Sequence, residues 1–252
     1  MNRGICMASA EPLRVVAQRL GSLPPPCAHC DARERNFCAA LDPAELAELA
    51  KVMTEATLPP GGVLFHEGAP ADYVMNVTDG AVKLFKLLGD GRRQILGFRF
   101  AGDFIGLSAG ADYSYSAESL TEAKLCRFPR RKLDAVRERF PQLDRRLLSL
   151  SIDELTAAQE QLLLLGRKTA EERLVSFLIL LSQGQVRRGQ TADPVVLPMT
   201  RSDIADYLGL TIETVSRTFS ALKKKGLIEL QDTTHIHLVD RDRLEEMASG
   251  LA

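Results

Sequence analysis

The sequence lacks the features of a membrane or secreted protein. No stretch reaches the ~18 consecutive apolar residues that a membrane-spanning helix needs. The first residues, MNRGICMASAEPLRVV, contain no apolar run followed by a small-residue cleavage site, so no secretory signal is predicted. We therefore expect a cytoplasmic protein with no membrane partner.

The patterns of common enzyme classes are missing as well. There is no phosphate-cradling glycine loop, no G-x-S-x-G nucleophile elbow and no pair of histidines at helical spacing, so we expect no enzyme. Excess charge is also absent, because 32 Lys and Arg balance 33 Asp and Glu for a formal net charge of -1. Any surface that binds a polyanion must therefore be local. The 252 residues, 45% hydrophobic and 26% charged, are typical of a globular chain with room for two cores.

Cysteine is scarce, but three of the five cysteines lie close together. The stretch CAHCDARERNFC contains Cys27, His29, Cys30 and Cys38 directly after three prolines. An odd number of thiols in a reducing compartment argues against a disulfide framework, and clustered cytosolic cysteines more often hold metal. Structural zinc remains an alternative, although such sites usually pair two C-x2-C hairpins and this chain has one. Free thiols are a further alternative, and His29 is expected to be solvated.

The segment from about residue 58 to residue 129 has the pattern of antiparallel β-structure. Asp79-Gly80 separates two β-rich runs and predicts a tight hairpin turn. Gly89, Asp90 and Gly91 predict a second hairpin, between strands at 84–88 and 94–98. Short strands with regularly spaced glycine turns indicate a closed roll or barrel.

A long helix is predicted from just after Pro141 to Leu165, followed by a second helix over about 170–181. Leucines recur every seven residues, which favours pairing with an identical helix in a parallel homodimer. The alternative is a helix packed only on its own domain. The predicted seam consists of Leu148, Leu155 and Leu162, with Ser151, Ala158 and Leu165 at the companion positions.

After a polar linker, QGQVRRGQTADP, the segment MTRSDIADYLGLTIETVSRTFSALKKKGLIEL predicts a helix-turn-helix. Thr200 or Ser202 can cap the first helix, residues 208–210 form a tight turn, and Thr211 begins a second helix that ends near Gly226. The stretch IELQDTTHIHLV then predicts a small β wing. The predicted inward-facing residues are Ile204, Ala205, Leu208, Val215, Phe219 and Leu222.

Polar residues share the outer face of the second helix. Glu213, Ser216 and Arg217 stand at i, i+3 and i+4, where the base edges of double-stranded DNA would lie. Arg can donate to guanine O6 and N7, and Glu can accept from cytosine N4. Thr211 and Thr214 complete the candidate DNA-binding set, and the three lysines at 223–225 could meet phosphate. The alternative is that these residues merely solvate an ordinary helical hairpin.

The order of cysteine loop, β-roll, long helix and winged helix-turn-helix resembles the CRP/FNR transcription regulators, and in particular their FNR branch of oxygen sensors. The stretches GFRFAGDFIG, RKTAEERLVSFL and LTIETVSR carry the resemblance. It implies an α+β fold in four parts. These are a leader with the cysteine loop and a short helix (1–57), an antiparallel β-roll (58–140), a dimerisation helix (141–165) and a winged helix-turn-helix DNA-binding domain (166–252).

The same resemblance implies a cofactor and its ligands. In FNR-type sensors, an N-terminal cysteine cluster and one cysteine of the roll hold a 4Fe-4S cluster, which oxygen degrades. Here the matching residues are Cys27, Cys30, Cys38 and Cys126, the last in AKLCRFP, with the longer C-x2-C-x7-C spacing as a variant. Cys6 lies outside the motif and is expected to stay free.

The resemblance also implies partners. The family's E-x-x-S-R signature falls on Glu213, Ser216 and Arg217 and implies palindromic sites of the TTGAT type, bound by a homodimer at low oxygen. The surface around Gly89 and Asp90 resembles a loop that contacts RNA polymerase. Other effectors were weighed: GLSAGADYSYSAESL lacks the Arg that a cyclic-nucleotide phosphate requires, and a haem would have His66 as a ligand without an obvious second one.

Overall fold

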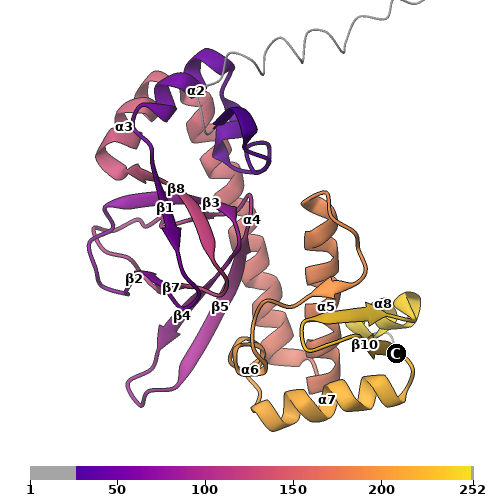
Figure 1. Ribbon diagram of the computed structural model, residues 1–252. Helices are drawn as coiled ribbons and strands as arrows, with labels where there is room; N and C mark the ends of the chain where they lie inside the picture. The colour runs from indigo at the N-terminus through magenta and orange to yellow at the C-terminus, as the bar shows by residue number, and fades with distance from the viewer. Residues whose placement is uncertain (1–26, 251–252) are drawn as a thin grey trace, which may run out of the picture.

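The computed structural model describes residues 27–250. Cys6 and the rest of the predicted leader before Cys27 lie outside this range. In Figure 1, a β-roll with helices above it occupies one side, the long helix α4 runs down the middle, and the C-terminal helices and small sheet lie at the lower right. Among residues 27–250, no helix is long and apolar enough to cross a membrane.

The described part of the chain begins with two short 3-10 helices, η1 (Cys27–His29) and η2 (Phe37–Ala40), and the helix α2 (Pro43–Ala50). Asp42 begins α2 because its carboxylate accepts hydrogen bonds from the backbone N–H groups of Ala44 and Glu45. These elements pack on the roll, where the Phe37 ring meets the Phe128 ring edge-on at 5.1 Å.

The β-roll consists of two four-stranded antiparallel sheets, ordered β1-β8-β3-β6 and β2-β7-β4-β5. Alternate residues of each strand point into the roll, where Val77, Val82 and Leu125 are buried. The strands are β1 (Thr54–Leu58), β2 (Val63–Phe65), β3 (Tyr73–Asp79), β4 (Ala81–Leu87), β5 (Arg93–Phe100), β6 (Phe104–Ile105), β7 (Ser116–Ser119) and β8 (Ala123–Pro129).

One predicted hairpin is confirmed and the other is wrong. β4 and β5 pair directly around Gly91, as the sequence predicts. β3 and β4, however, belong to different sheets, so Asp79-Gly80 is a corner at which the chain crosses between sheets. Gly80 has the positive φ of 81° that the motif indicates, and a Cβ there would collide with the Glu122 carbonyl oxygen. A local turn signal fixes backbone angles but not which strands pair.

Three helices follow the roll: α3 (Arg130–Arg139), α4 (Pro141–Arg167) and α5 (Ala170–Arg187). With 27 residues, α4 is about 40 Å long at ~1.5 Å per residue. α5 continues through part of the predicted linker because Gln185 is buried and bonds the loop that follows, donating to the carbonyl oxygens of Thr191 and Pro194.

The C-terminal part contains the predicted helix-turn-helix and wing. α6 (Arg201–Leu208) is capped by Thr200, and α7 (Ile212–Lys224) by Thr211, with Gly209 between them in the left-handed region at φ 62°. The predicted inward-facing residues are all buried. The wing is β10 (Ile228–Leu230) paired with β11 (His235–Leu238), to which the structure adds β9 (Val195–Val196) and a final helix α8 (Arg241–Ser249).

Candidate cofactor cavity and nucleic-acid interface

Four cysteines line one cavity of about 400 Å³ on the outer face of the β1-β8-β3-β6 sheet. Cys27 and Cys30 come from η1 and the residue after it, and Cys38 comes from η2. Cys126 lies in the middle of β8, where it faces the leader because its neighbour Leu125 points into the roll. The fold thus brings together residues that are nearly a hundred positions apart.

Burial and mutual repulsion dominate the chemistry of these thiols. Burial raises the pKa of Cys38 well above the ordinary thiol value, and the neighbouring Cys27, Cys126 and Cys30 raise it further. Burial, followed by Cys30, Cys27 and Glu55, raises the pKa of Cys126 to about 12. The raised pKa values keep the thiols of Cys38 and Cys126 protonated when nothing is bound. A cation that binds them must displace their protons and supply the charge that stabilises the thiolates.

The donor set of the cavity consists of four thiols. Among residues 27–250, no three His, Cys, Asp or Glu side chains lie close enough together to bind one metal ion. In a 4Fe-4S cluster each cysteine binds a different iron, so the four sulfurs surround a volume and do not converge on one point. Four thiols around one cavity meet that requirement. His29 also lines the cavity but is exposed, in line with the expectation that it is solvated.

Sequence reasoning missed one residue of this cavity. Asn76, on β3, is 1% exposed and donates from Nδ2 to the sulfur of Cys38 at 3.5 Å. Its Oδ1 is buried without a hydrogen-bond partner in the described structure. Asn76 stands directly opposite Cys126 in the β3–β8 register. The signal in the sequence that could have identified Asn76 is a polar residue inside an otherwise apolar strand.

In the stretch GLSAGADYSYSAESL, two tyrosines make contacts within the roll. The Tyr113 ring stacks on Phe65 at 3.6 Å, and its hydroxyl donates to the Tyr73 carbonyl oxygen at 2.8 Å. The Tyr115 hydroxyl accepts from the Gly106 N–H at 3.1 Å. The aromatic side chains of the roll therefore make internal contacts in this region.

The outer face of α7 carries the candidate DNA-binding residues. Glu213, Ser216 and Arg217 are all exposed, and α7 lies at the edge of the molecule opposite the cysteine cavity (Figure 1). Thr211 caps the helix, accepting from the Thr214 N–H at 3.2 Å, and Arg217 Nη2 donates to Thr214 Oγ1 at 3.5 Å. The two threonines thus order the start of the helix and the guanidinium beside it.

The lysines at the end of α7 are not equivalent. Lys223 and Lys224 are exposed and stand free to meet phosphate. Lys225 instead forms an ion pair with Glu171 of α5 at 2.5 Å. Phosphate contact by the three lysines stays a prediction, with Lys225 already engaged in an exposed ion pair.

The leucine seam on α4 is exposed in the single chain. Leu148, Leu155 and Leu162 are 63%, 59% and 71% exposed. Leu165 is half-buried and packs against the core of the C-terminal part, so its place on the seam stays a prediction. Ser151 donates to the Leu147 carbonyl oxygen, and Ile152, at 54% exposure, provides the apolar companion instead. The exposed stripe is therefore Leu148, Ile152, Leu155 and Leu162.

Comparisons with known proteins agree with this architecture. Residues 55–140 match the cyclic nucleotide-binding domain family, and residues 172–247 match the Crp-like helix-turn-helix domain. The chain is 39% identical over 224 residues to the nitrogen fixation regulation protein FixK of Bradyrhizobium diazoefficiens, covering 89% of this chain and 94% of that protein. It is 37% identical over 226 residues to the transcriptional activator protein FnrL of Cereibacter sphaeroides, covering 88% and 91%.

A solved structure shows the same fold. The structure of FixK2 from Bradyrhizobium japonicum superimposes with a TM-score of 0.73 at 39% identity, over 78% of this chain and 97% of that one. The α+β fold class predicted from the sequence, with its roll, long helix and helix-turn-helix, is confirmed. The FixK and FnrL relatives align over most of their length. Their names describe a regulation protein and a transcriptional activator. The chain therefore belongs to the CRP/FNR superfamily of DNA-binding transcription regulators.

Proposed function

We propose that this regulator responds to oxygen through a 4Fe-4S cluster bound by Cys27, Cys30, Cys38 and Cys126. The observation that carries the proposal is that these four thiols line one cavity. The cluster supplies the oxygen-sensitive centre when bound. The protein supplies four sulfur ligands, the hydrogen bond from Asn76 to Cys38, and an apolar wall that includes Leu49 and Phe128.

The leader is physically connected to the long helix. Arg146 of α4 donates from Nη2 to the Arg35 carbonyl oxygen at 2.9 Å, within the loop between Cys30 and Cys38. Leu143 and Leu147, in the first turns of α4, share an apolar cluster with Phe37 and Cys38. Holding or releasing Cys38 therefore acts directly on the start of α4. This contact is the route by which the state of the cavity would bias dimerisation.

The exposed stripe of α4 is the proposed homodimer seam, and α4 is the dimerisation helix between the roll and a DNA-binding domain over residues 166–252. Two copies that pair along this stripe would each present α7 at the same end of the assembly. Recognition helices of dimeric regulators of this kind enter successive major grooves about 34 Å apart. The dimer would then bind TTGAT-type palindromes at low oxygen, with Thr211, Glu213, Thr214, Ser216 and Arg217 at the DNA.

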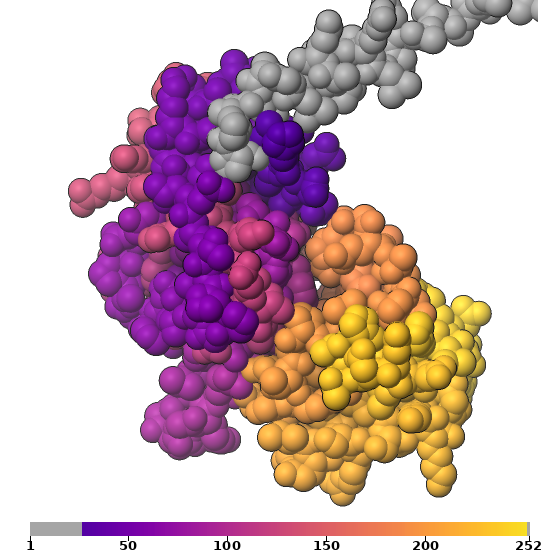
Figure 2. Space-filling model, in the orientation of Figure 1, coloured from indigo at the N-terminus to yellow at the C-terminus, as the bar shows by residue number. Residues whose placement is uncertain are grey.

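RNA polymerase is the proposed partner of the β4–β5 hairpin. Its tip, which includes Gly89 and Asp90, protrudes at the lower left of the molecule (Figure 2). Leu87 and Leu88, next to the tip, are 61% and 48% exposed. Two adjacent exposed leucines on a projecting turn give a partner protein apolar surface to bury.

Purification without air tests the proposal. The protein is expected to be straw-brown, with about four iron and four sulfide per chain. Its affinity for the palindrome should fall after exposure to air, together with the colour. A colourless preparation that contains stoichiometric zinc would overturn the cluster assignment. Palindrome binding that stays unchanged in air would overturn the oxygen response.

A further inference from the structure

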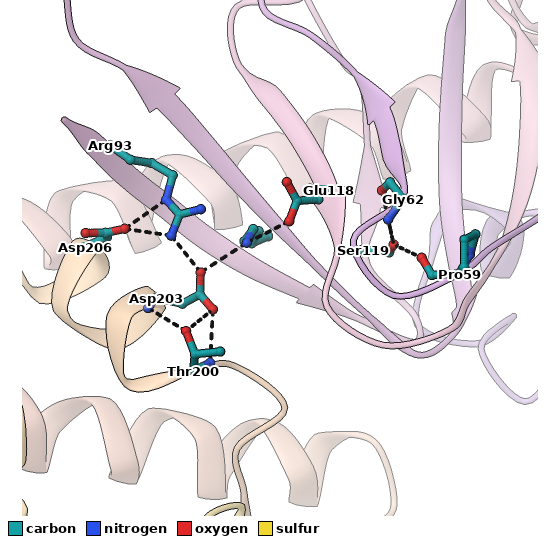
Figure 3. Close-up of polar contacts among 9 residues, drawn as sticks. Pro59, Gly62, Arg93, Glu118, Ser119, Thr200, Asp203 and Asp206 are labelled. Carbon is teal, nitrogen blue, oxygen red and sulfur yellow. Dashed lines mark hydrogen bonds and ion pairs between the residues drawn. The ribbon is translucent and has the colours of Figure 1, made fainter. Parts of the chain in front are cut away.

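A buried network of ion pairs joins the β-roll to the first helix of the helix-turn-helix (Figure 3). Asp203 of α6 is 3% exposed and accepts from Lys83 Nζ at 3.1 Å and from Arg93 Nη2 at 3.0 Å. Arg93 also pairs with Asp206 at 2.8 Å. Lys83 also pairs with Glu118 of β7 at 2.8 Å. Two cations of the β4–β5 hairpin thus clamp two carboxylates one helical turn apart.

A second layer of contacts lies beside the network. The Tyr207 ring packs between Phe98 of β5 and Phe177 of α5, with each ring centroid 5.3 Å away. The Tyr207 carbonyl oxygen accepts from Gln94 of β5 at 3.5 Å and from Gln161 of α4 at 2.9 Å. The C-terminal end of α6 is therefore held by the roll and by the long helix at once.

Compared with an apolar contact, such a network contributes fixed geometry more than added stability. Burying charges costs desolvation energy, and replacing a buried ion pair by apolar residues is often neutral or stabilising. A charged pair, however, accepts few geometries, because any other arrangement leaves a buried charge without its partner. Because the contacts lie at both Asp203 and Asp206, a rotation or a slide of α6 along the hairpin would break at least one of them.

The orientation of α6 is passed on to α7. Thr200 and Asp203 form the capping box of α6, so the carboxylate in the network also orders the start of the helix. α7 follows after the short turn at Gly209, and Ala205 and Val215 are buried where the two helices pack together. A helix pair packed this closely moves as one body.

We propose that Lys83, Arg93, Asp203 and Asp206 are positioning residues that hold the recognition helix at the one orientation in which a dimer spans two half-sites of fixed spacing. This inference rests on the proposed binding of a palindrome. None of the four residues lies on the outer face of α7. Their effect is therefore on the spacing between half-sites and not on the reading of bases within one.

Arg93→Ala, Asp206→Ala and the double variant test the inference in the air-free full-length protein. Affinities are measured for the preferred palindrome, for palindromes with one or two base pairs added to or removed from the spacer, and for a single half-site. Each single variant should bind the preferred palindrome roughly tenfold more weakly, and the double variant no more weakly than either, because contacting residues are not additive. The preference among spacers should flatten, while affinity for the half-site stays unchanged.

Two matched variants accompany these. Arg92→Ala removes an exposed ion pair with Asp90 on the same hairpin and should leave every affinity unchanged. Arg93→Lys keeps a positive charge at the clamp and should restore part of the spacer preference. Because Arg93 and Asp206 are each about a quarter exposed, with 26% and 27% of the side chain accessible, truncation is expected to leave the protein folded.

The outcomes separate this inference from the proposed function. Equal losses on the palindrome and the half-site would overturn the positioning role, since they would show a general defect of the helix-turn-helix. An unchanged spacer preference in Arg93→Ala and Asp206→Ala would overturn it too. A wild-type protein that prefers no palindrome at any spacing would instead overturn the proposed function.

Discussion

Asn76 donates a hydrogen bond from its side-chain amide to the sulfur of Cys38, at 3.5 Å. The same residue stands opposite Cys126 across the β3–β8 ladder. One buried amide thus contacts one proposed cluster ligand and lies beside a second. Hydrogen bonds to a ligand sulfur orient the ligand and tune the bound metal, so Asn76 belongs to the proposed site as a supporting residue.

Replacing this amide should weaken cluster retention. Asn76→Leu keeps the approximate volume but removes the donor to Cys38, and loss of such a supporting contact typically costs about 10- to 100-fold in metal affinity. Iron and sulfide per chain after gel filtration without air should fall below the wild-type content. Thr78→Val is the control, because Thr78 lines the same cavity two residues further along β3. A full cluster in Asn76→Leu would contradict the supporting role.

Serine substitution should distinguish the four proposed ligands from Cys6. Changing Cys27, Cys30, Cys38 or Cys126 to Ser removes one of the four sulfurs that a cluster requires, so each variant should lose the brown absorbance. Cys6→Ser should keep it. Visible absorbance and iron content of protein purified without air provide the measurement. Loss of colour in the Cys6 variant alone would refute the ligand assignment.

The face of α7 should separate specific from general DNA binding. Arg217→Ala should cost about 1 to 3 kcal/mol on the preferred palindrome and relax the preference at the contacted guanine. Lys224→Ala should weaken all sequences alike, because a phosphate contact carries no base information. Titrations of specific and random duplexes at one salt concentration check both. The same loss on both duplexes for Arg217→Ala would show that the reading face lies elsewhere.

A charge in the exposed stripe of α4 should prevent dimerisation. In Leu155→Glu, two carboxylates would face each other across the dimer axis, and buried like charges without partners are costly. Sedimentation without air should show a monomer that keeps its brown cluster, since the site lies at the far end of α4. A dimer that binds the palindrome normally would place the switch elsewhere, in the hinge around residues 166–170.

An added apolar residue on the same stripe should have the opposite effect. Gln159 is exposed and lies seven residues after Ile152, in line with the stripe. Gln159→Leu should add apolar burial at about 25 cal/mol per Å² and shift the protein towards dimers in air. Ser151→Leu is the matched control, because Ser151 lies off the stripe. Stronger dimerisation in Ser151→Leu than in Gln159→Leu would restore the companion positions predicted from the sequence.

The ion-pair network between the β-roll and α6 should weaken in acid. Burial alone would raise the pKa of Asp203, but hydrogen bonds from Thr200 and the ion pair with Lys83 outweigh it, so the pKa lies below the ordinary value. A carboxylate with a lowered folded-state pKa stabilises the fold above its unfolded pKa, and that stability is lost as pH falls through the folded value. In urea unfolding at pH 6, the wild type should have a higher free energy of unfolding than Asp203→Asn. This difference should shrink progressively below about pH 4. A difference that does not change with pH would contradict the charged state.

Local patterns determined much of this protein from the sequence alone. Thr200, Gly209 and Thr211 stand at helix boundaries because capping and left-handed turns depend on a few adjacent residues. The apolar spacing of α6 and α7 likewise identifies the buried and exposed faces, which left Glu213, Ser216 and Arg217 outside. The grouping of Cys126 with the leader cysteines came from the family resemblance, because spacing cannot relate residues so far apart.

Only the tertiary structure decided which distant residues meet. Asp203 and Asp206 carry no signal of a distant partner in the sequence, yet they pair with Lys83 and Arg93 from more than 100 positions away. Asp79-Gly80 read as a hairpin, yet the two strands joined there pair with other strands. Leu165 fits the heptad, yet in the single chain it is half-buried against the C-terminal core. Side-chain periodicity fixes a face on its own element, whereas the partner of that face depends on how all the elements pack together.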